Sequence, residues 1–449
     1  MRILVVSNGF PPRGRFGTEF YTRELVRGLA ARGHELAVLH PVRDGSRPRY
    51  SLEEVREEGV PVFLLHNPGD PRKRFRTSYE DARVEAVFDE LLARWQPECV
   101  HFLYLVWGLS VRLPEVARRR GIPAAVTLTD FTLLCHRGQM YDHRLERCFG
   151  PHPPAVCARC IREPGPYDLP PFARAVKRTL AHGLAAFGGL GLVPTAADLA
   201  RRESFVRGVF DAAATLIAPT ANLLELFRRG GAPAEKLVHL PYAFDEAPFV
   251  AVRDRAPHPP GSSAPARFGF FGQFAPHKGF GTLLEAAQRL ERERPGAFFE
   301  VVLYGSPAPG RHRLFAERLL GRTGATCIRR AAPFEPDEAA RVLAGLTALV
   351  APSEWDENAP LAILQARSAG VPVVASDVPG IAEVVVPGRH GLLFPPGDAS
   401  ALAAALAQVL DGEPGRALDP GLPLSYDEHL SRLEELHRTL STPAHPQAK

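Results

Sequence analysis

The stretch Ala351-Pro-Ser-Glu-Trp-Asp-Glu-Asn-Ala-Pro-Leu-Ala-Ile-Leu-Gln-Ala-Arg-Ser-Ala-Gly370 carries most of the information about the fold. It follows an apolar run at residues 346–350 that is typical of a buried strand, and a second such run follows at 371–375. Between them, Pro360 near the start and Gly370 past the end predict a helix over 361–369, with Asn358 as its N-cap. A strand, a helix and a strand in this order indicate a parallel βαβ unit.

The same alternation of apolar runs and helical patterns extends along the rest of the chain. We expect further strands at residues 3–6, 35–39, 60–65, 99–102, 124–128, 215–218, 237–240, 267–271 and 299–304. We expect further helices at residues 18–32, 83–95, 111–120, 221–229, 281–291, 311–320, 399–410 and 426–440. The sequence therefore predicts an α/β protein with two doubly wound, Rossmann-like domains that face each other across a cleft. In such folds ligands bind at the carboxyl ends of the strands, so the cleft is the expected site.

A Pro-rich stretch at residues 247–266 interrupts the alternation and is typical of a linker. It divides the chain into an N-terminal domain at 1–246 and a C-terminal domain at 267–412. The tail at 413–449 contains one more helix, which we expect to pack back on the N-terminal domain.

The overall composition excludes several classes of protein. The chain has 449 residues, of which 45% are hydrophobic and 23% are charged, which suits two or three globular domains. A net charge of +4 is too small to indicate a nucleic-acid partner. Apolar runs are too short for a signal peptide or a membrane span, so we expect a cytoplasmic protein. Basic runs at 72–76 and 118–120, with the uncharged segment 184–194, are either solvated faces or a contact with anionic lipid at the inner face of the membrane.

Three loops carry residues that suit a phosphorylated ligand. In Phe268-Gly-Phe-Phe-Gly-Gln-Phe-Ala-Pro-His-Lys-Gly-Phe-Gly281, a strand ends in a Gly-rich loop whose Lys278 can neutralise a diphosphate, although an ordinary helix-initiating turn fits equally well. In Phe10-Pro-Pro-Arg-Gly-Arg-Phe-Gly-Thr-Glu19, Gly14 and Gly17 let a ligand approach the backbone. The helix start near residue 361 suits a phosphate. No P-loop or dinucleotide fingerprint is present, which weakens the case for ATP hydrolysis and hydride transfer.

Acidic residues beside this last anion site need another role. Glu354, Asp356 and Glu357 suit hydrogen bonds from sugar hydroxyls, and simple helix capping is the alternative.

Further motifs connect these loops in a specific order. They are Arg32-Gly-His-Glu35, Ile217-Ala-Pro-Thr220, Pro241-Tyr-Ala-Phe-Asp245, Gly370-Val-Pro-Val-Val-Ala375 and Pro379-Gly-Ile-Ala-Glu383. In order and spacing the chain resembles, nearly end to end, the retaining, nucleotide-sugar-dependent glycosyltransferases of the GT-B fold, family 4. The signature of that group, two glutamates separated by seven residues, falls on Glu357 and position 365.

The resemblance implies a reaction and its residues. A sugar would move with retention from a UDP, GDP or ADP sugar to a saccharide or lipid-linked acceptor on the N-terminal domain, and catalysis would need no metal. The implied catalytic residues are Glu357 on the sugar hydroxyls, Lys278 on the diphosphate and Asp130 near the acceptor or sugar. The implied donor-binding residues are Gly17, Gln273, Lys278, Glu357, Asn358, Ala359, Pro360, Leu361 and Gln365.

Three positions depart from the pattern of the group. The second glutamate is Gln365, the usual arginine partner of Lys278 is Gln273, and the expected His-Asp pair is Thr129-Asp130. Two alternatives therefore stay open. One is a catalytically degraded GT-B scaffold or partner subunit, and the other is a nucleotide-sugar epimerase or hydrolase of the same fold.

Four cysteines lie in an insertion at residues 135–160 with the spacing Cys135-x12-Cys148-x8-Cys157-x2-Cys160. Four thiolates can form a tetrahedral set, so we expect a structural Zn²⁺, with free thiols, redox pairs or an iron–sulfur cluster as alternatives. The resemblance extends to a subset of these glycosyltransferases that carries such cysteines. Cys99 and Cys327 lie in expected strands and are predicted to be core residues.

Overall fold

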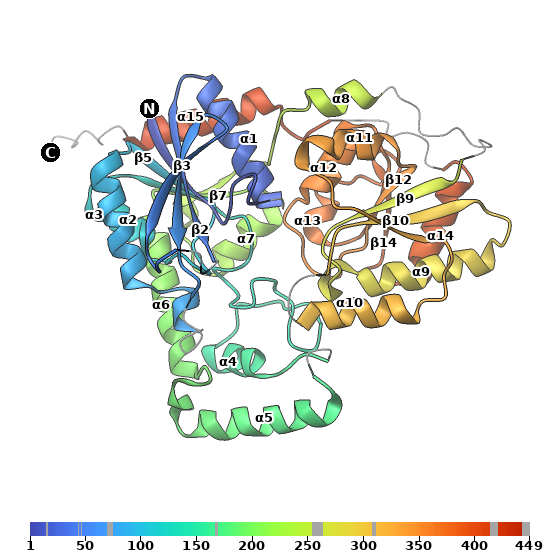
Figure 1. Cartoon of the computed structure of the whole chain (residues 1–449), viewed down its shortest axis with the longest axis horizontal. Coiled ribbons are helices and arrows are strands. Elements are labelled where there is room, and N and C mark those ends of the chain that lie inside the picture. Colours follow the sequence, from blue (N-terminus) through green and yellow to red (C-terminus); the bar gives the residue numbers. More distant parts are fainter. Residues whose placement is uncertain are drawn as a thin grey trace.

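The chain forms two α/β units that lie side by side, each with a central sheet and helices on both faces (Figure 1). The computed structural model describes residues 1–14, 17–43, 45, 47–69, 75–166, 169–253, 264–307, 311–413 and 421–441. The predicted fold class, two doubly wound Rossmann-like domains, is confirmed.

The first sheet has eight strands in the described residues, in the order β3-β4-β2-β1-β5-β6-β7-β8. Its strands are β1 (Arg2–Val6), β2 (Glu35–Val42), β3 (Leu52–Glu57), β4 (Val60–His66), β5 (Cys99–Phe102), β6 (Ala124–Thr127), β7 (Thr215–Ala218) and β8 (Leu237–His239). Neighbours pair in parallel except β3 and β4, which form an antiparallel pair at the edge. The inner strands β5, β6 and β7 are buried throughout because helices cover both faces.

The second sheet has six strands in the described residues, all parallel, in the order β11-β10-β9-β12-β13-β14. They are β9 (Ala266–Phe271), β10 (Phe299–Tyr304), β11 (Ile328–Ala331), β12 (Ala348–Ala351), β13 (Val373–Ser376) and β14 (Gly391–Phe394). The βαβ unit expected around residues 346–375 is β12, α12 (Leu361–Ser368) and β13, with Leu349 opposite Val373.

Helices pack on both faces of each sheet. Those of the first domain include α1 (Gly17–Ala31), α2 (Ala82–Trp95), α3 (Leu113–Arg119), α6 (Ala196–Ala212) and α7 (Ala221–Arg229). Those of the second domain include α9 (Phe280–Glu293), α10 (Arg311–Arg322), α11 (Ala339–Ala344), α13 (Pro379–Ala382) and α14 (Ala399–Leu410). Between β6 and α6 the chain forms a projecting region with α4 (Pro154–Arg162), α5 (Pro171–Ala186) and the 3-10 turn η2 (Gly188–Gly191), at the lower edge of Figure 1.

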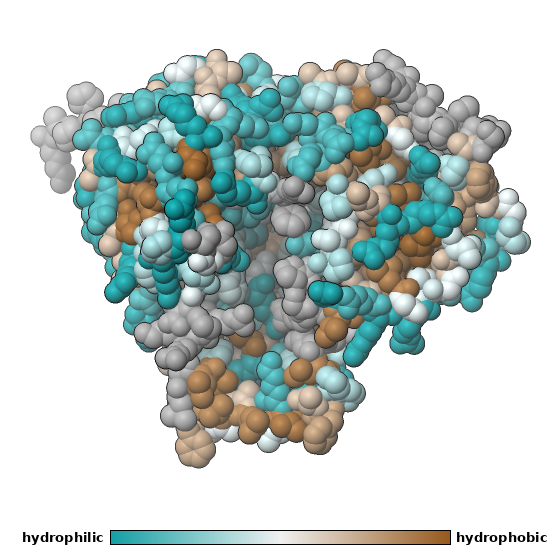
Figure 2. Space-filling view, in the orientation of Figure 1, coloured by the Kyte–Doolittle hydropathy of each residue, from teal (hydrophilic) through white to brown (hydrophobic). Residues whose placement is uncertain are grey.

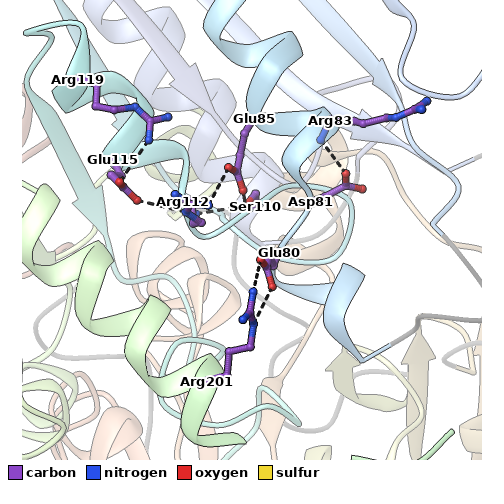
Figure 3. A network of polar contacts seen from close by, with 9 residues as sticks. All are labelled: Glu80, Asp81, Arg83, Glu85, Ser110, Arg112, Glu115, Arg119 and Arg201. Carbon is purple, nitrogen blue, oxygen red and sulfur yellow. Dashed lines mark hydrogen bonds and ion pairs between the residues drawn. The ribbon is translucent and has the colours of Figure 1, made fainter. Parts of the chain in front are cut away.

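A polar network ties α2, α3 and α6 together where the projecting region begins (Figure 3). The Glu85 carboxylate accepts a hydrogen bond from Ser110 Oγ at 2.8 Å and forms an ion pair with Arg112 at 3.4 Å. Arg201 of α6 donates to both oxygens of Glu80 at 2.8 and 3.3 Å. The Arg201–Glu80 pair is partly exposed, and such pairs each contribute about 0–1 kcal/mol, so this contact orients α6 rather than dominating its stability.

Two predictions about local structure are wrong. Residues 247–253 were expected in a linker but form α8 (Ala247–Arg253), which packs on α11 and α12, with Pro248 in the first turn where proline is tolerated. The rest of the Pro-rich stretch, 254–263, lies outside the described residues. Asn358 is not the N-cap of α12, because the helix begins only at Leu361 with Pro360 before it.

The last helix, α15 (Tyr426–Ser441), returns to the first domain and packs against α1 and β5 (Figure 1). Its His429 Nε2 lies 2.9 Å from the hydroxyl of Tyr21, and its His437 Nε2 lies 3.1 Å from Nδ1 of His101. The Arg32 guanidinium donates to Glu434 at 2.8 Å. The C-terminal helix therefore packs on the N-terminal domain through a contact in which His101, His429 and His437 are buried.

These buried histidines predict that the protein loses stability in mild acid. Burial lowers the pKa of His429 and of His437 to about 4, and it lowers that of His101 as well. A histidine whose folded pKa lies below its unfolded value of about 6.5 contributes stability that is full above pH 6.5 and is lost as pH falls toward 4. We expect the free energy of unfolding to fall by about 2 kcal/mol per histidine between pH 7 and pH 5.

Denaturant titrations at the two pH values test this, with His437→Gln as the informative variant. It should show a smaller pH dependence than the unsubstituted chain, whereas His239→Gln, at an exposed histidine, should keep the full dependence. An unchanged pH dependence in His437→Gln would contradict the assignment.

Candidate active site

A cavity of about 350 Å³ lies at the carboxyl edge of the second sheet, where the first domain meets it. Its walls come from the loops after β9, β10 and β11, from the first turns of α12 and from the start of α1. The lining residues are Gly17, Phe20, Phe271, Gly272, Gln273, Tyr304, Gly305, Ser306, Pro333, Phe334, Pro336, Ala339, Leu361, Ala362 and Gln365. This is the edge where doubly wound sheets bind ligands.

The cavity has an aromatic wall and an uncharged lining. The rings of Phe271, Tyr304 and Phe334 contact one another, with centroids 4.9 to 5.6 Å apart. None of the described lining residues is charged, and Gln273 and Gln365 provide amide groups. The cavity therefore offers flat apolar surfaces and neutral hydrogen-bonding groups.

The loop after β9, which lines the cavity with Gly272 and Gln273, also carries one partner of an ion pair whose carboxylate is buried. Lys278, in the loop after β9, places Nζ 2.7 Å from Oε1 of Glu357, in the loop after β12. Ser353 Oγ donates to the same oxygen at 2.5 Å, and Lys278 Nζ also lies 4.6 Å from the ring centroid of Trp355. Glu357 is only 5% exposed. The structure thus brings together the two charged residues that the sequence singled out.

The other two acidic residues of this loop have structural partners. Glu354 accepts hydrogen bonds from Thr282 Oγ1 at 2.5 Å and from the Tyr141 hydroxyl at 3.1 Å. Asp356 forms an ion pair with Arg147. Both carboxylates therefore hold the loop in place, which the sequence alone did not distinguish from sugar binding.

Two glycines let the backbone of this region approach closely. Gly279 has φ +66°, and a Cβ there would lie 1.6 Å from the carbonyl oxygen of Pro352. A Cβ on Gly380 would lie 1.7 Å from the carbonyl oxygen of Glu357. Any side chain at either position would displace the loop that carries Glu357.

The segment between Glu357 and α12 connects to the first domain. Asn358 Nδ2 donates to the carbonyl oxygen of Leu128 at 2.9 Å, and Ala359 adopts a left-handed φ of +45° before Pro360. Next to it, the Glu383 carboxylate accepts hydrogen bonds from the backbone N–H groups of the first two residues of α7, both at 2.7 Å. These contacts between the two domains fix the site from both sides, and no sequence pattern pointed to Glu383 as a cap of α7.

Asp130 follows β6 and lies outside the 350 Å³ cavity. Its Oδ1 accepts hydrogen bonds from Thr132 N at 2.8 Å and from Thr132 Oγ1 at 2.5 Å, and burial raises the pKa of its carboxyl group. Together with Tyr104, Asp130 lines a separate cavity of about 20 Å³. In the sequence it lies two residues after Leu128, whose carbonyl accepts the hydrogen bond from Asn358. At the position of the expected histidine, Thr129 Oγ1 donates to the carbonyl of Leu103.

None of the four cysteines of the insertion forms a disulfide within the described residues. Cys135 and Cys148 flank the hairpin around Tyr141 and Arg147, whereas Cys157 and Cys160 lie in α4. Burial and, after it, the charges of the other three thiols raise the pKa of Cys157 to about 11.

The described residues include no group of three or more His, Cys, Asp or Glu arranged to hold a metal ion. The subset with four metal-binding cysteines is therefore not confirmed, and the Zn²⁺ site stays a prediction for metal analysis. Cys99 and Cys327 are buried, as expected for core residues.

Comparisons with known proteins identify the family. Residues 16–243 match the family described as "Glycosyl transferase 4-like domain", and residues 265–412 match "Glycosyl transferases group 1". The chain therefore belongs to the glycosyltransferases that these two descriptions name. The two matches meet near the junction of the two sheets, so each domain of this glycosyltransferase has its own match.

Curated relatives support the same assignment over most of the chain. A glycogen synthase from Mycobacterium tuberculosis is 27% identical over 427 residues, which cover 92% of this chain and 86% of the relative. A D-inositol 3-phosphate glycosyltransferase from Pseudarthrobacter chlorophenolicus is 28% identical over 416 residues, which cover 90% and 84% of the two chains.

Solved structures show the same GT-B fold. A sucrose-phosphate synthase from Thermosynechococcus elongatus superposes with a TM-score of 0.62 at 18% identity, covering 98% of this glycosyltransferase and 96% of that chain. HepE from Anabaena, in complex with UDP-glucose, gives a TM-score of 0.57 at 15% identity and covers 98% and 97%.

The close approach at Gly380 predicts a sharp effect of one methyl group. In Gly380→Ala, the Cβ must push the backbone of Glu357 away, and overpacking of this kind typically costs about 1–3 kcal/mol. Gly296→Ala is the matched control, because no atom lies within 4 Å of the added Cβ. Thermal unfolding of both variants measures the effect, and equal stability of the two would contradict the described contact.

Proposed function

We propose that this glycosyltransferase moves a sugar from a nucleoside diphosphate sugar to a saccharide or lipid-linked acceptor, with retention of the anomeric configuration. The observation that carries the proposal is the Lys278–Glu357 pair. Neither side chain lines the uncharged cavity, but Lys278 lies in the same loop as Gln273, which does. Among the structural neighbours, HepE is described in complex with UDP-glucose and an E. coli trehalose-6-phosphate protein with UDP-2-fluoro glucose, which supports a donor of this class.

The cavity suits the nucleoside and the diphosphate. The wall of Phe271, Tyr304 and Phe334 provides apolar ring surfaces for a base, and Gln365 provides an amide for ribose hydroxyls. Leu361 and Ala362 form the first turn of α12, whose N–H groups have no partner within the helix. The positive end of the helix dipole favours the phosphate groups at this position.

The ion pair suits the chemical step. Donor-sugar hydroxyls would donate to Glu357, while Lys278 would turn toward the diphosphate and stabilise the charge that develops on it. The bond between the anomeric carbon and the phosphate oxygen breaks, and the acceptor oxygen bonds to that carbon from the same face. The proton of the acceptor hydroxyl passes to the leaving phosphate oxygen, so atoms and charge balance without a protein base. Asp130, across the junction, would contact the acceptor or the transferred sugar.

Gln273 and Gln365 favour a second candidate, a scaffold or partner subunit without turnover. Both amides are neutral where the family pattern has charged groups, so the described lining of the cavity carries no charge for the diphosphate. Calorimetry with UDP, GDP and ADP distinguishes the two candidates, because a scaffold would bind none of them. A donor assay without acceptor separates the third candidate, a hydrolase or epimerase of the same fold.

The central prediction concerns Glu357→Gln. The substitution keeps the shape of the side chain but removes the charge that binds the sugar hydroxyls, so we expect turnover to fall by about 100-fold or more. Nucleotide affinity should change only a few-fold, and circular dichroism should report an unchanged fold. Glu293→Gln, at an exposed glutamate of α9, is the control and should keep full turnover. Unchanged turnover in Glu357→Gln would exclude this residue from the reaction.

A second prediction uses the departure at position 365. A carboxylate accepts hydrogen bonds from ribose hydroxyls more strongly than an amide does, so Gln365→Glu should tighten nucleotide binding by about 5- to 10-fold. Calorimetry measures it, with Gln408→Glu at an exposed position of α14 as the control for the added charge. Equal affinity in Gln365→Glu and in the unsubstituted chain would place the ribose elsewhere.

A further inference from the structure

The outer face of α5 exposes large apolar side chains. Phe172 is 82% exposed and Leu180 is 62% exposed, and beyond the helix Phe187 and Leu192 are 78% and 72% exposed. Figure 2 shows apolar, brown residues gathered along the lower edge of the molecule, where Figure 1 places α5. Single exposed apolar residues are ordinary, but a continuous set on one projecting helix indicates a contact surface.

Helical spacing places these residues on one face. Phe172, Val176 and Leu180 follow one another at intervals of four, and all three are exposed. The opposite face makes the contacts with the rest of the protein: Ala181 is buried, and His182 Nε2 lies 2.8 Å from Oε1 of Glu163. The fold therefore packs one side of α5 and leaves an apolar side that it does not use.

A shallow groove continues this apolar surface. Its volume is about 420 Å³, and it lies between α5 and the segment that follows η2. The lining residues are Phe172, Ala173, Val176, Lys177, Leu180, Ala181, Leu184 and Val193. Lys177 is the only charged residue among them, so the groove extends the apolar surface of α5.

The charges around this face all have one sign. From residue 169 to residue 197 the sequence contains no Asp or Glu but contains Arg174, Lys177 and Arg178. Lys177 and Arg178 are exposed at the two borders of the apolar face. An apolar helix face bordered by cations complements an anionic lipid bilayer, whose head groups carry negative charge and whose acyl chains below them are apolar.

We propose that this face of α5 docks on an anionic lipid bilayer, with α5 lying in the plane of the interface. Phe172, Val176 and Leu180 would enter the boundary of the acyl chains, and Lys177 and Arg178 would contact lipid phosphates. Within the described residues no helix is both long and apolar enough to cross a bilayer. The proposal holds whether or not the protein transfers a sugar.

This surface differs from the lipid contact that the sequence indicated. Residues 72–74 of the first basic run lie outside the described residues. In the second basic run, Arg119 forms an ion pair with Glu115 and Arg120 forms one with Asp89, so their charges are already balanced. Lys177 and Arg178 form no ion pair with any residue that the structure describes, and they adjoin the apolar face.

Sedimentation of the full chain with vesicles tests the proposal. We expect binding to vesicles of equal parts phosphatidylglycerol and phosphatidylcholine, and at least tenfold weaker binding to pure phosphatidylcholine. The double variant Phe172→Ser/Leu180→Ser should lose at least tenfold in binding, because two large apolar side chains no longer leave water. Lys177→Gln/Arg178→Gln should lose the preference for anionic vesicles.

The control is Phe298→Ser/Leu314→Ser, which removes two exposed apolar side chains of the second domain, 64% and 50% exposed, and should bind vesicles like the unsubstituted chain. In a second measurement, the added fluorophore of Leu180→Trp should shift its emission to the blue on anionic vesicles. Unchanged nucleotide binding and circular dichroism would show that the variants fold.

Three results would overturn the proposal. The first is an unsubstituted chain that does not bind anionic vesicles, and the second is a Phe172→Ser/Leu180→Ser variant that binds as tightly as the control. The third is a dimer in solution that this variant dissociates, because the face would then be a contact between two copies of the chain.

Discussion

The ion pair between Lys278 and the buried carboxylate of Glu357 sets the geometry on which the rest of the site depends. A carboxylate that is 5% exposed is costly to leave without partners, and here Lys278 and Ser353 both contact the same oxygen. The two residues belong to loops after β9 and β12, which are neighbours in the sheet, with Gly269 opposite Leu349. Because parallel strands end at the same edge, the strand order itself brings the charges together. The backbones of the same two loops also approach each other closely, because a Cβ on Gly279 would lie 1.6 Å from the carbonyl oxygen of Pro352.

The loop that carries Glu357 belongs to both domains. On one side it packs against the second sheet, and on the other it is held by side chains and backbone of the first domain. Tyr141 donates to Glu354, Arg147 pairs with Asp356, and Asn358 donates to the Leu128 carbonyl. Opening of the cleft would break these contacts in the same movement that changes the surroundings of Glu357. The position of the donor loop and the closure of the two domains are therefore physically coupled.

Sequence patterns predicted the inner strands because buried parallel strands are near-continuous apolar runs, as in β12. They missed the edge strands β3 and β11, whose sequences LEEVRE and IRRA carry charges because one side faces water. The resemblance to the glycosyltransferase family also implied residues that line one cavity, such as Gly17 and Gln365. It could not show that Asn358 holds a carbonyl 230 positions away, because that partner depends on how the two domains meet.

The neutral lining of the cavity gives the Lys278–Glu357 pair a further consequence in the proposed reaction. With Gln273 and Gln365 uncharged, the diphosphate is left with the N-terminus of α12 and with Lys278. Lys278 Nζ lies 2.7 Å from Oε1 of Glu357, so in the proposed reaction the lysine would turn to a phosphate only if something else satisfied the buried carboxylate. Sugar hydroxyls can do this, whereas a nucleotide without its sugar cannot. In the proposed reaction the ion pair would therefore make the two halves of the donor bind cooperatively. It would favour an intact nucleotide sugar over the free nucleotide that remains after transfer.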